Sequence, residues 1–265
     1  MASLSRSNNF LNYLVGKISD LGYYFIFVRD SLSWMFKAPY RTSEFIKHME
    51  FIGNKSVLII CLTGFFTGMV LSFQIYLGFN LINAENLVGP TVGLGIFREL
   101  GPVLTGLIVS ARAGGAMAAR IGTMRVTEQI DALDVMGINP KQYLVAPRIL
   151  AATICAPMLT AVFDFVAMLG SYFICIHLLY LDEAIFIDKV NSMIDPSHIN
   201  EGLFKAMCFG FLFGTICTYK GYNTKGGAKG VGEATNSGVV ISMVCIIVSD
   251  FFLTKIVRIF IGWTS

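Results

Sequence analysis

The sequence predicts an all-α polytopic membrane protein with three parts. These are an N-terminal interfacial amphipathic helix, five transmembrane helices, and a short cytosolic helix between the second and third spans. Of the 265 residues, 55% are hydrophobic and only 14% are charged, whereas soluble domains carry about 25% charged residues. The mean hydropathy is +0.67. The chain therefore belongs in a membrane.

Five segments are long and apolar enough to cross a bilayer, which takes about 20 residues as a helix. They are Val57–Phe79, Leu100–Ile121, Ala151–Tyr180, Phe204–Tyr219 with its flanks, and Val239–Ile261. The second is rich in glycine and alanine, with Ala111, Gly115 and Ala119 spaced four residues apart. Such spacing favours close helix packing, either within the chain or between two copies of it.

The segment Leu21–Phe36 differs from these spans. Its apolar residues recur at helical spacing at Leu21, Phe25, Val28, Leu32 and Met35. Arg29 and Asp30 would lie at mid-bilayer in a spanning helix, at a cost of about 2.5–3.5 kcal/mol each. An amphipathic helix in the membrane interface fits better, with a spanning helix as the alternative. The first twenty residues lack the pattern of a cleaved signal, so we expect insertion through the chain's own spans.

The distribution of basic residues orients the spans. They gather in residues 1–56, in the loop after the second span and in the loop after the fourth, while the other two loops are acidic. The positive-inside rule then places the N-terminus in the cytoplasm and the C-terminus in the periplasm. Only Lys255 and Arg258, near the outer end of the last span, disagree.

The stretch GTMRVTEQIDALDVMGINP (Gly122–Pro140) interrupts this apolar chain. Thr127 is a predicted N-cap, Glu128 falls in the first turn, and Gly137 with Pro140 ends the helix. About nine residues rise only about 13 Å, so this helix cannot span. One face is acidic and another apolar: Glu128, Asp131 and Asp134 against Val126, Ile130 and Leu133. The acidic face is either solvated or docks onto basic residues of a partner.

A long part of the chain resembles a known family. The segment RELGPVLTGLIVSARAGGAMAARIGTMRVTEQIDALDVMGINPKQYLVAPRILA (Arg98–Ala151) closely resembles the MlaE/YrbE family of ABC-transporter permeases, and GAKGVGEATNSGVV (Gly227–Val240) resembles that family's loop before the last span. The resemblance implies a single permease domain over 1–265, with a cytoplasmic or interfacial region over 1–50 and a transmembrane bundle over 51–265. It also implies residence in a bacterial inner membrane and transport of lipid, with phospholipid as the expected cargo, between the inner and outer membranes.

The resemblance also assigns a role to the short helix. It would be a coupling helix seated in a groove of an ATPase subunit, formed by Thr127, Glu128, Gln129, Asp131, Leu133, Asp134 and Met136. Two copies of the chain would pair with two ABC ATPase subunits and with a periplasmic MCE-domain substrate-binding protein. The glycine-rich KGGAKGVGEAT lacks the GxxxxGK[ST] of a phosphate-binding loop. We therefore expect no enzymatic activity and no cofactor in this chain, with ATP and magnesium on the partner ATPase.

Two groups of residues are candidates for the substrate cavity. Arg98 and Glu99 stand at the mouth of the second span, either as interfacial anchors or as a polar element of the cavity; the resemblance favours the cavity. Adjacent helical positions do not face each other, so we do not expect these two to pair. Phe66, Phe73 and Tyr76 on the first span suit acyl chains, or else they face bilayer lipid.

Asp164 and Asp250 lie within apolar spans. Each is either a proton or ion site or a structural hydrogen-bonding group. An ion-coupled secondary transporter using them is one alternative function, and a non-transporting envelope scaffold is another. The six cysteines lie in apolar runs and the histidines are isolated, so we expect no metal site. The net charge of +3 is small and dispersed, so we expect no nucleic-acid partner.

Overall fold

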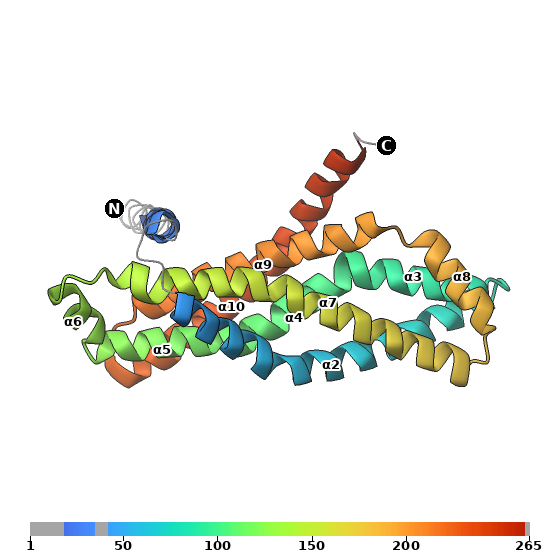
Figure 1. Ribbon diagram of the computed structural model, residues 1–265, viewed down its shortest axis with the longest axis horizontal. Coiled ribbons are helices and arrows are strands. Elements are labelled where there is room, and N and C mark those ends of the chain that lie inside the picture. Colours follow the sequence, from blue (N-terminus) through green and yellow to red (C-terminus); the bar gives the residue numbers. More distant parts are fainter. Residues whose placement is uncertain (1–18, 35–41, 263–265) are drawn as a thin grey trace, which may run out of the picture.

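The computed structural model describes residues 19–34 and 42–262, with side chains described as far as residue 259. Within these ranges the chain is helical and contains no strand. The labelled helices are α2 (Thr42–Asn80), α3 (Val88–Gly95), α4 (Gly101–Val109), α5 (Gly115–Val126), α6 (Gln129–Val135), α7 (Ala146–His177), α8 (Glu183–Met193), α9 (Pro196–Tyr222) and α10 (Gly227–Gly262). The long helices run side by side along one axis, except that the C-terminal part of α10 leaves the bundle at an angle (Figure 1).

Five helical runs among the described residues are long and apolar enough to cross a membrane, which confirms the predicted fold class. They are Thr42–Asn80, Glu85–Val126, Lys141–His177, Pro196–Tyr222 and Gly227–Ile259. Each contains most or all of a predicted span and extends beyond at least one of its ends. The helical run that begins at Thr42 continues through residue 50. No helix end therefore coincides with the predicted boundary between the interfacial region over 1–50 and the transmembrane bundle over 51–265.

The second span is one continuous run built from three α-helices. Two π-helical turns, Ile96–Leu100 and Ser110–Gly114, join α3 to α4 and α4 to α5. A π-helical turn widens the helix locally and redirects the side chains around it, and such turns are frequent at functional sites. A third π-helical turn, Lys141–Val145, precedes α7.

The helix of residues 19–34 lies across the bundle. Figure 1 shows it end-on, whereas the long helices run horizontally. Its inward face contacts the end of α9. Tyr24 shares a 2.7 Å hydrogen bond with Thr215. Phe27 is 5% exposed and packs against Tyr219 and Tyr222. These contacts support the interfacial placement over the spanning alternative.

The outward face of this helix is apolar. Leu21 and Phe25 are 59% and 62% exposed, so the predicted apolar stripe points away from the bundle at these positions, as expected of a face that contacts lipid. Its polar side is tied to the bundle by Lys141, which donates a 2.9 Å hydrogen bond to Asp30 and thereby lowers the pKa of that carboxyl. The predicted end of the helix, Met35 and Phe36, lies outside the described residues.

Small residues bring the long helices into close contact. A Cβ added to Gly68 of α2 would lie 1.9 Å from the Ala167 carbonyl oxygen of α7, and one added to Gly170 of α7 would lie 2.2 Å from that of Phe65. The small residues predicted to pack closely, Ala111, Gly115 and Ala119, make part of their contacts within the chain. A Cβ added to Gly115 would lie 3.1 Å from Val239 of α10. Close helix packing thus extends through the bundle, as small residues allow in lipid.

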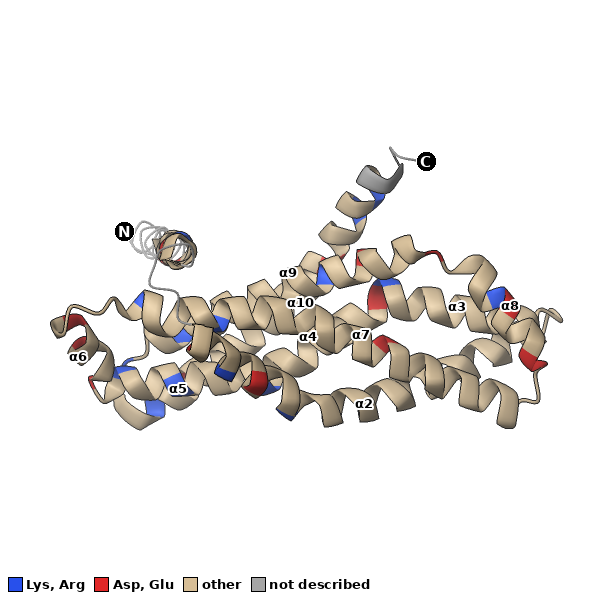
Figure 2. Cartoon of the chain, viewed as in Figure 1, with Lys and Arg blue, Asp and Glu red and all other residues tan. Residues whose placement is uncertain are grey.

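The two ends of the bundle differ. The helices α6 and α8 occupy opposite ends (Figure 1). Charged residues are sparse along the middle, and basic residues gather near α5 and α6 (Figure 2). A few charged residues nevertheless lie within the bundle, and they form the site described next.

Candidate functional site

Arg98 and Glu99 lie in the π-helical turn Ile96–Leu100. They lie well inside the helical run, which begins at Glu85, and their place at the mouth of the membrane span stays a prediction. Their side chains diverge, as predicted. Arg98 Nε lies 3.1 Å from Glu201 Oε2, and Glu99 accepts a 2.8 Å hydrogen bond from Lys205.

Lys205 is the centre of this charged network. Its side chain has no exposed surface. The ammonium donates three hydrogen bonds, to the Arg98 carbonyl oxygen at 2.9 Å, to Glu99 at 2.8 Å and to Thr254 at 2.8 Å. Three donors with three acceptors satisfy a buried ammonium completely, so Lys205 joins the π-helical turn to α10.

Acidic groups complete the network. Asp250 Oδ1 of α10 lies 3.5 Å from Lys205 Nζ, and Glu201 Oε1, one turn before Lys205 on α9, lies 3.9 Å from it. Two basic side chains, Arg98 and Lys205, thus face three acidic ones. Arg98 Nε, Glu201 Oε1 and Asp250 Oδ1 are buried and make no hydrogen bond in the described structure. Each nevertheless faces an oppositely charged side chain of the network.

A close helix approach makes the network possible. A Cβ added to Gly202 would lie 1.9 Å from the Phe97 carbonyl oxygen. Only glycine lets α9 come this near the π-helical turn. The same approach brings Glu201 and Lys205 up to Arg98 and Glu99.

Sequence reasoning did not single out Glu201 and Lys205. The signal was present, because the two residues stand four apart at the start of an apolar helix, and ionisable residues at membrane depth mark functional positions. Because the predicted fourth span begins at Phe204, Glu201 lies on its flank and not within the predicted apolar core. Their partners on α10 and in the π-helical turn are more than forty residues away in sequence.

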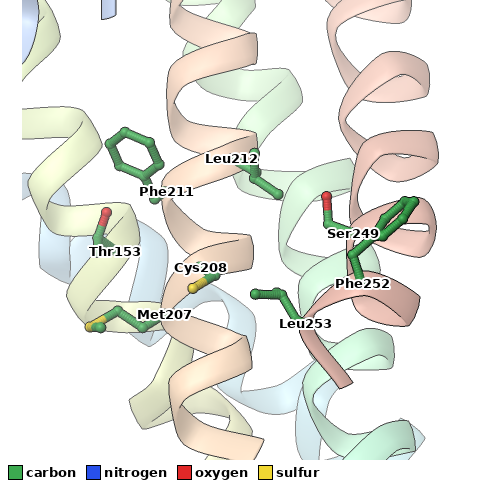
Figure 3. A pocket seen from close by; sticks show the side chains of 8 residues that line it. All are labelled: Thr153, Met207, Cys208, Phe211, Leu212, Ser249, Phe252 and Leu253. Carbon is green, nitrogen blue, oxygen red and sulfur yellow. The ribbon is translucent and has the colours of Figure 1, made fainter. Parts of the chain in front are cut away.

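An apolar groove shares the helices α9 and α10 with the network. It has a volume of about 500 Å³ and runs between α7, α9 and α10. Figure 3 shows the side chains that line it: Thr153, Met207, Cys208, Phe211, Leu212, Ser249, Phe252 and Leu253. Ser249 and Leu253 are the direct neighbours of Asp250 and Thr254 in α10. Charged groups and an apolar groove thus share the same helical segments.

The predicted aromatic residues of the first span lie elsewhere. Phe66 and Phe73 are 55% and 43% exposed on α2. Phe66 lines a second groove of about 330 Å³ on that helix. Tyr76 is partly buried against the core. Within the described part of one chain, no contact joins these residues to the Lys205 network.

The two intramembrane acids separate in the structure. Asp250 belongs to the Lys205 network. Asp164 of α7 is 3% exposed, and a Cβ added to Gly101 would lie 1.8 Å from its Oδ1. That oxygen has no hydrogen-bond partner in the described structure. Asp164 therefore packs against Gly101, the residue that follows the π-helical turn.

The short helix between the second and third spans is present as α6, with corrected limits. It covers Gln129–Val135, and Glu128 is its N-cap with φ 60°. The predicted cap, Thr127, instead ends α5, and its hydroxyl donates to the Thr123 carbonyl oxygen. The left-handed turn at Glu128 therefore sets the angle between α5 and α6. It also removes Glu128 from the helical acidic stripe.

The faces of α6 differ in burial. Ile130 is 1% exposed and packs in a cluster with Phe27 and Leu144. Asp131 pairs with Arg125, so this carboxylate is partly neutralised within the chain. Glu128 and Asp134 are exposed, as are Gln129, Val135 and Met136. The free surface of α6 is thus acidic and apolar together.

The sequence of the chain matches a known family and several known proteins. The sequence profile described as "Permease MlaE" matches residues 45–256. The chain is 40% identical over 249 residues to a probable ABC transporter permease protein of Rickettsia prowazekii, covering 92% of this chain and 96% of that one.

Two further relatives carry more specific names. The chain is 34% identical over 212 residues to the intermembrane phospholipid transport system permease protein MlaE of Haemophilus influenzae, covering 80% of this chain and 81% of that one. It is also 36% identical over 210 residues to the chloroplastic protein TRIGALACTOSYLDIACYLGLYCEROL 1 of Arabidopsis thaliana, covering 79% and 60%.

Proposed function

This chain belongs to the MlaE permease family, and from that premise we propose that it is the membrane subunit of an ABC-type transporter that moves phospholipid between the inner and outer membranes of a bacterium. It resides in the inner membrane with its N-terminus in the cytoplasm and its C-terminus in the periplasm. A separate ATPase supplies the energy. The chain itself binds no cofactor, and ATP and magnesium are held by the ATPase.

The observation that carries the proposal is that α9 and α10 contribute both to the Lys205 network and to an apolar groove. A phospholipid has a charged headgroup joined to apolar chains. The network holds buried charged atoms that make no hydrogen bond in the described structure, and the groove on α7, α9 and α10 has a volume of about 500 Å³, within the range of ligand-binding sites of about 300–1,000 Å³. In this arrangement the network contacts the headgroup and the groove holds an acyl chain.

Coupling to the ATPase runs through α6. Its exposed carboxylates Glu128 and Asp134 meet basic residues of the ATPase, and its exposed apolar tip, Val135 and Met136, fills a pocket there. Ile130 fixes α6 to the bundle, so displacement of α6 moves the ends of α5 and α7 with it. Through α5 the movement reaches the second span and its π-helical turns.

Two further partners complete the assembly. A second copy of the chain pairs with the first, and the groove of about 590 Å³ along the small residues of α5 and α10 is available for that contact. A periplasmic MCE-domain protein delivers or receives lipid at the α8 end. With two copies facing each other, Phe66 and Phe73 of α2 line the cavity together with Arg98 and Glu99.

The first test is copurification. We would express the chain with its ATPase and MCE-domain partners, purify by a tag on this chain, and compare wild type with the E128K/D134K variant. The triple variant E128K/D131K/D134K also removes the ion pair with Arg125. The control is D188K, which also reverses the charge of an exposed acidic residue but lies on α8, at the opposite end of the bundle.

We expect wild type and D188K to retain the ATPase and both α6 variants to lose it, while all four remain folded. Retention by both α6 variants would mean that the acidic surface is only solvated, and would overturn the docking role.

The alternatives make different predictions in proteoliposomes. Lipid transfer that requires ATP and the ATPase supports the proposal. Transport by the chain alone under an ion gradient, abolished by Asp250→Asn, would instead identify a secondary transporter. An intact complex without ATP-dependent lipid movement would identify a scaffold.

A further inference from the structure

A second cluster of basic side chains lies toward the α6 end of the bundle, on α2, the π-helical turn Ser110–Gly114, α5 and α7, apart from the Lys205 network. We call Lys55, Arg112, Arg120 and Arg148 the basal cluster. On the proposed orientation it lies at the cytoplasmic leaflet of the membrane. Figure 2 shows basic residues gathered at this end.

Three of these cations surround one aromatic ring. The Arg120 and Arg112 guanidinium carbons lie 4.3 and 5.0 Å from the centroid of Phe51, and Lys55 Nζ lies 5.5 Å from it. A ring face attracts each cation, but three cations at one ring repel one another. The arrangement therefore favours an anion that lies among them.

The protein supplies little negative charge to this cluster. Arg112 is satisfied by neutral groups, since it donates to the Phe51 and Ile52 carbonyl oxygens and to Ser56. Arg120 and Lys55 form no ion pair with a carboxylate in the described structure. Glu44 pairs with Lys47 at 2.8 Å and also interacts electrostatically with Arg148 without forming an ion pair with it. The exposed Glu50 pairs with none of the described cations.

Arg148 makes the cluster more than a solvated basic surface. It is 6% exposed, and it donates one hydrogen bond, to the Leu144 carbonyl oxygen at 3.2 Å. Its Nε is buried with no hydrogen-bond partner in the described structure. It lies close enough to Arg120 for their charges to interact. The positive-inside rule accounts for exposed cations near lipid headgroups, whereas a buried guanidinium with an unused donor requires an acceptor.

We propose that the basal cluster binds the phosphate of an anionic phospholipid in the cytoplasmic leaflet. Arg120 and Lys55 meet the headgroup, Arg148 supplies a buried donor, and the acyl chains lie along the exposed apolar face of α2 at Leu58 and Leu62, which are 76% and 57% exposed. Basic pockets between spans on the cytoplasmic side suit anionic headgroups. The site is separate from the transport network and needs no ATPase.

The test uses the purified full-length chain in mild detergent. Native mass spectrometry would measure binding of phosphatidylglycerol and of phosphatidylcholine with identical acyl chains. We expect wild type to prefer phosphatidylglycerol and K55Q/R120Q to lose that preference. Each basic residue contributes about a fivefold change in affinity, so we expect a loss on the order of twentyfold. The matched control is K225Q/K229Q, which removes two exposed lysines from the same end.

Arg148 is tested by R148K, which keeps the charge and removes the planar donor set. We expect it to weaken phosphatidylglycerol binding severalfold, with circular dichroism and the melting temperature checking the fold. An unchanged preference in K55Q/R120Q would overturn the proposal, as would an equal loss in K225Q/K229Q. Displacement of the lipid by millimolar inorganic phosphate would assign the site to a free anion instead. Because the assay contains no ATPase, its failure would leave the proposed transport function untouched.

Discussion

Lys205 shows how one buried charge organises the membrane-embedded part of this protein. Its ammonium satisfies three groups on two segments that are distant in sequence, namely Arg98 and Glu99 in the π-helical turn and Thr254 on α10. Transfer of a charge into a membrane is costly. The cost is offset here because every ammonium proton has an acceptor. Removing the cation leaves Glu99 and Asp250 without a basic partner, while Glu201 keeps Arg98.

We therefore expect Lys205→Met to destabilise the protein by about 3–5 kcal/mol, the usual cost of breaking a buried charge pair. Thermal unfolding in detergent would measure the loss, and adding Asp250→Asn should recover part of it, since it removes one uncompensated carboxylate. Lys229→Met is the control, because that side chain is 88% exposed. Equal melting temperatures for Lys205→Met and wild type would refute the central role of the ammonium.

A second prediction concerns Glu128, whose φ of 60° is unusual for a residue with a side chain. Glycine adopts this conformation without the steric cost of about 1–2 kcal/mol, though it also gains freedom in the unfolded state. We expect Glu128→Gly to raise the free energy of unfolding by about 0.5–1 kcal/mol and Glu128→Val to lower it. Melting temperatures of the two variants would check this. A lower value for Glu128→Gly would contradict a strained turn.

At the scale of helices, close approach between α2 and α7 governs packing. Gly68 has no room for a Cβ against Ala167, whereas Gly78 on the same helix has no atom within 4 Å of an added Cβ. The two glycines thus differ in their tolerance of one methyl group. This contrast separates packing from the intrinsic helix preference of alanine.

We expect Gly68→Ala to lower the free energy of unfolding by about 1–3 kcal/mol, the usual cost of overpacking. Gly78→Ala should leave it unchanged or raise it by up to about 1 kcal/mol, because alanine favours helix. Thermal unfolding of both variants in the same detergent is the measurement. Equal effects at the two positions would mean that the α2–α7 contact is looser than the structure shows.

At the scale of the molecule, five spans place α6 and α8 on opposite sides of the membrane, as Figure 1 shows for the two ends of the bundle. The basic residues near α6 are the basis on which we propose that this end faces the cytoplasm. This orientation underlies both the docking proposal and the basal cluster.

Met136→Cys on α6 and Asp188→Cys on α8 would test it. A membrane-impermeant maleimide should label Asp188→Cys in right-side-out vesicles and Met136→Cys only in inside-out vesicles. The wild-type chain, with its six native cysteines, is the control for background labelling. The reverse pattern would invert the topology and place the basal cluster at the outer leaflet.

The fold class was predictable from sequence because a helix that crosses lipid needs a long apolar run. The charges of the loops between such runs follow the positive-inside rule. Thus the five spans, the short helix before Gly137 and the divergence of Arg98 from Glu99 could all be anticipated from local pattern. Helix limits were less predictable. The cap moved from Thr127 to Glu128 because a left-handed turn depends on how α5 and α6 pack, and no local signal required it.

The charged network was decided by tertiary structure alone. Lys205 meets Glu99 only because Gly202 lets α9 approach the π-helical turn, and Asp250 meets Lys205 only because α10 packs beside α9. Asp164 stays outside that network, although its sequence context resembles that of Asp250. Whether a segment can span the membrane depends on the hydropathy of that segment alone. Which charged side chains pair depends on which faces of helices distant in sequence pack against each other.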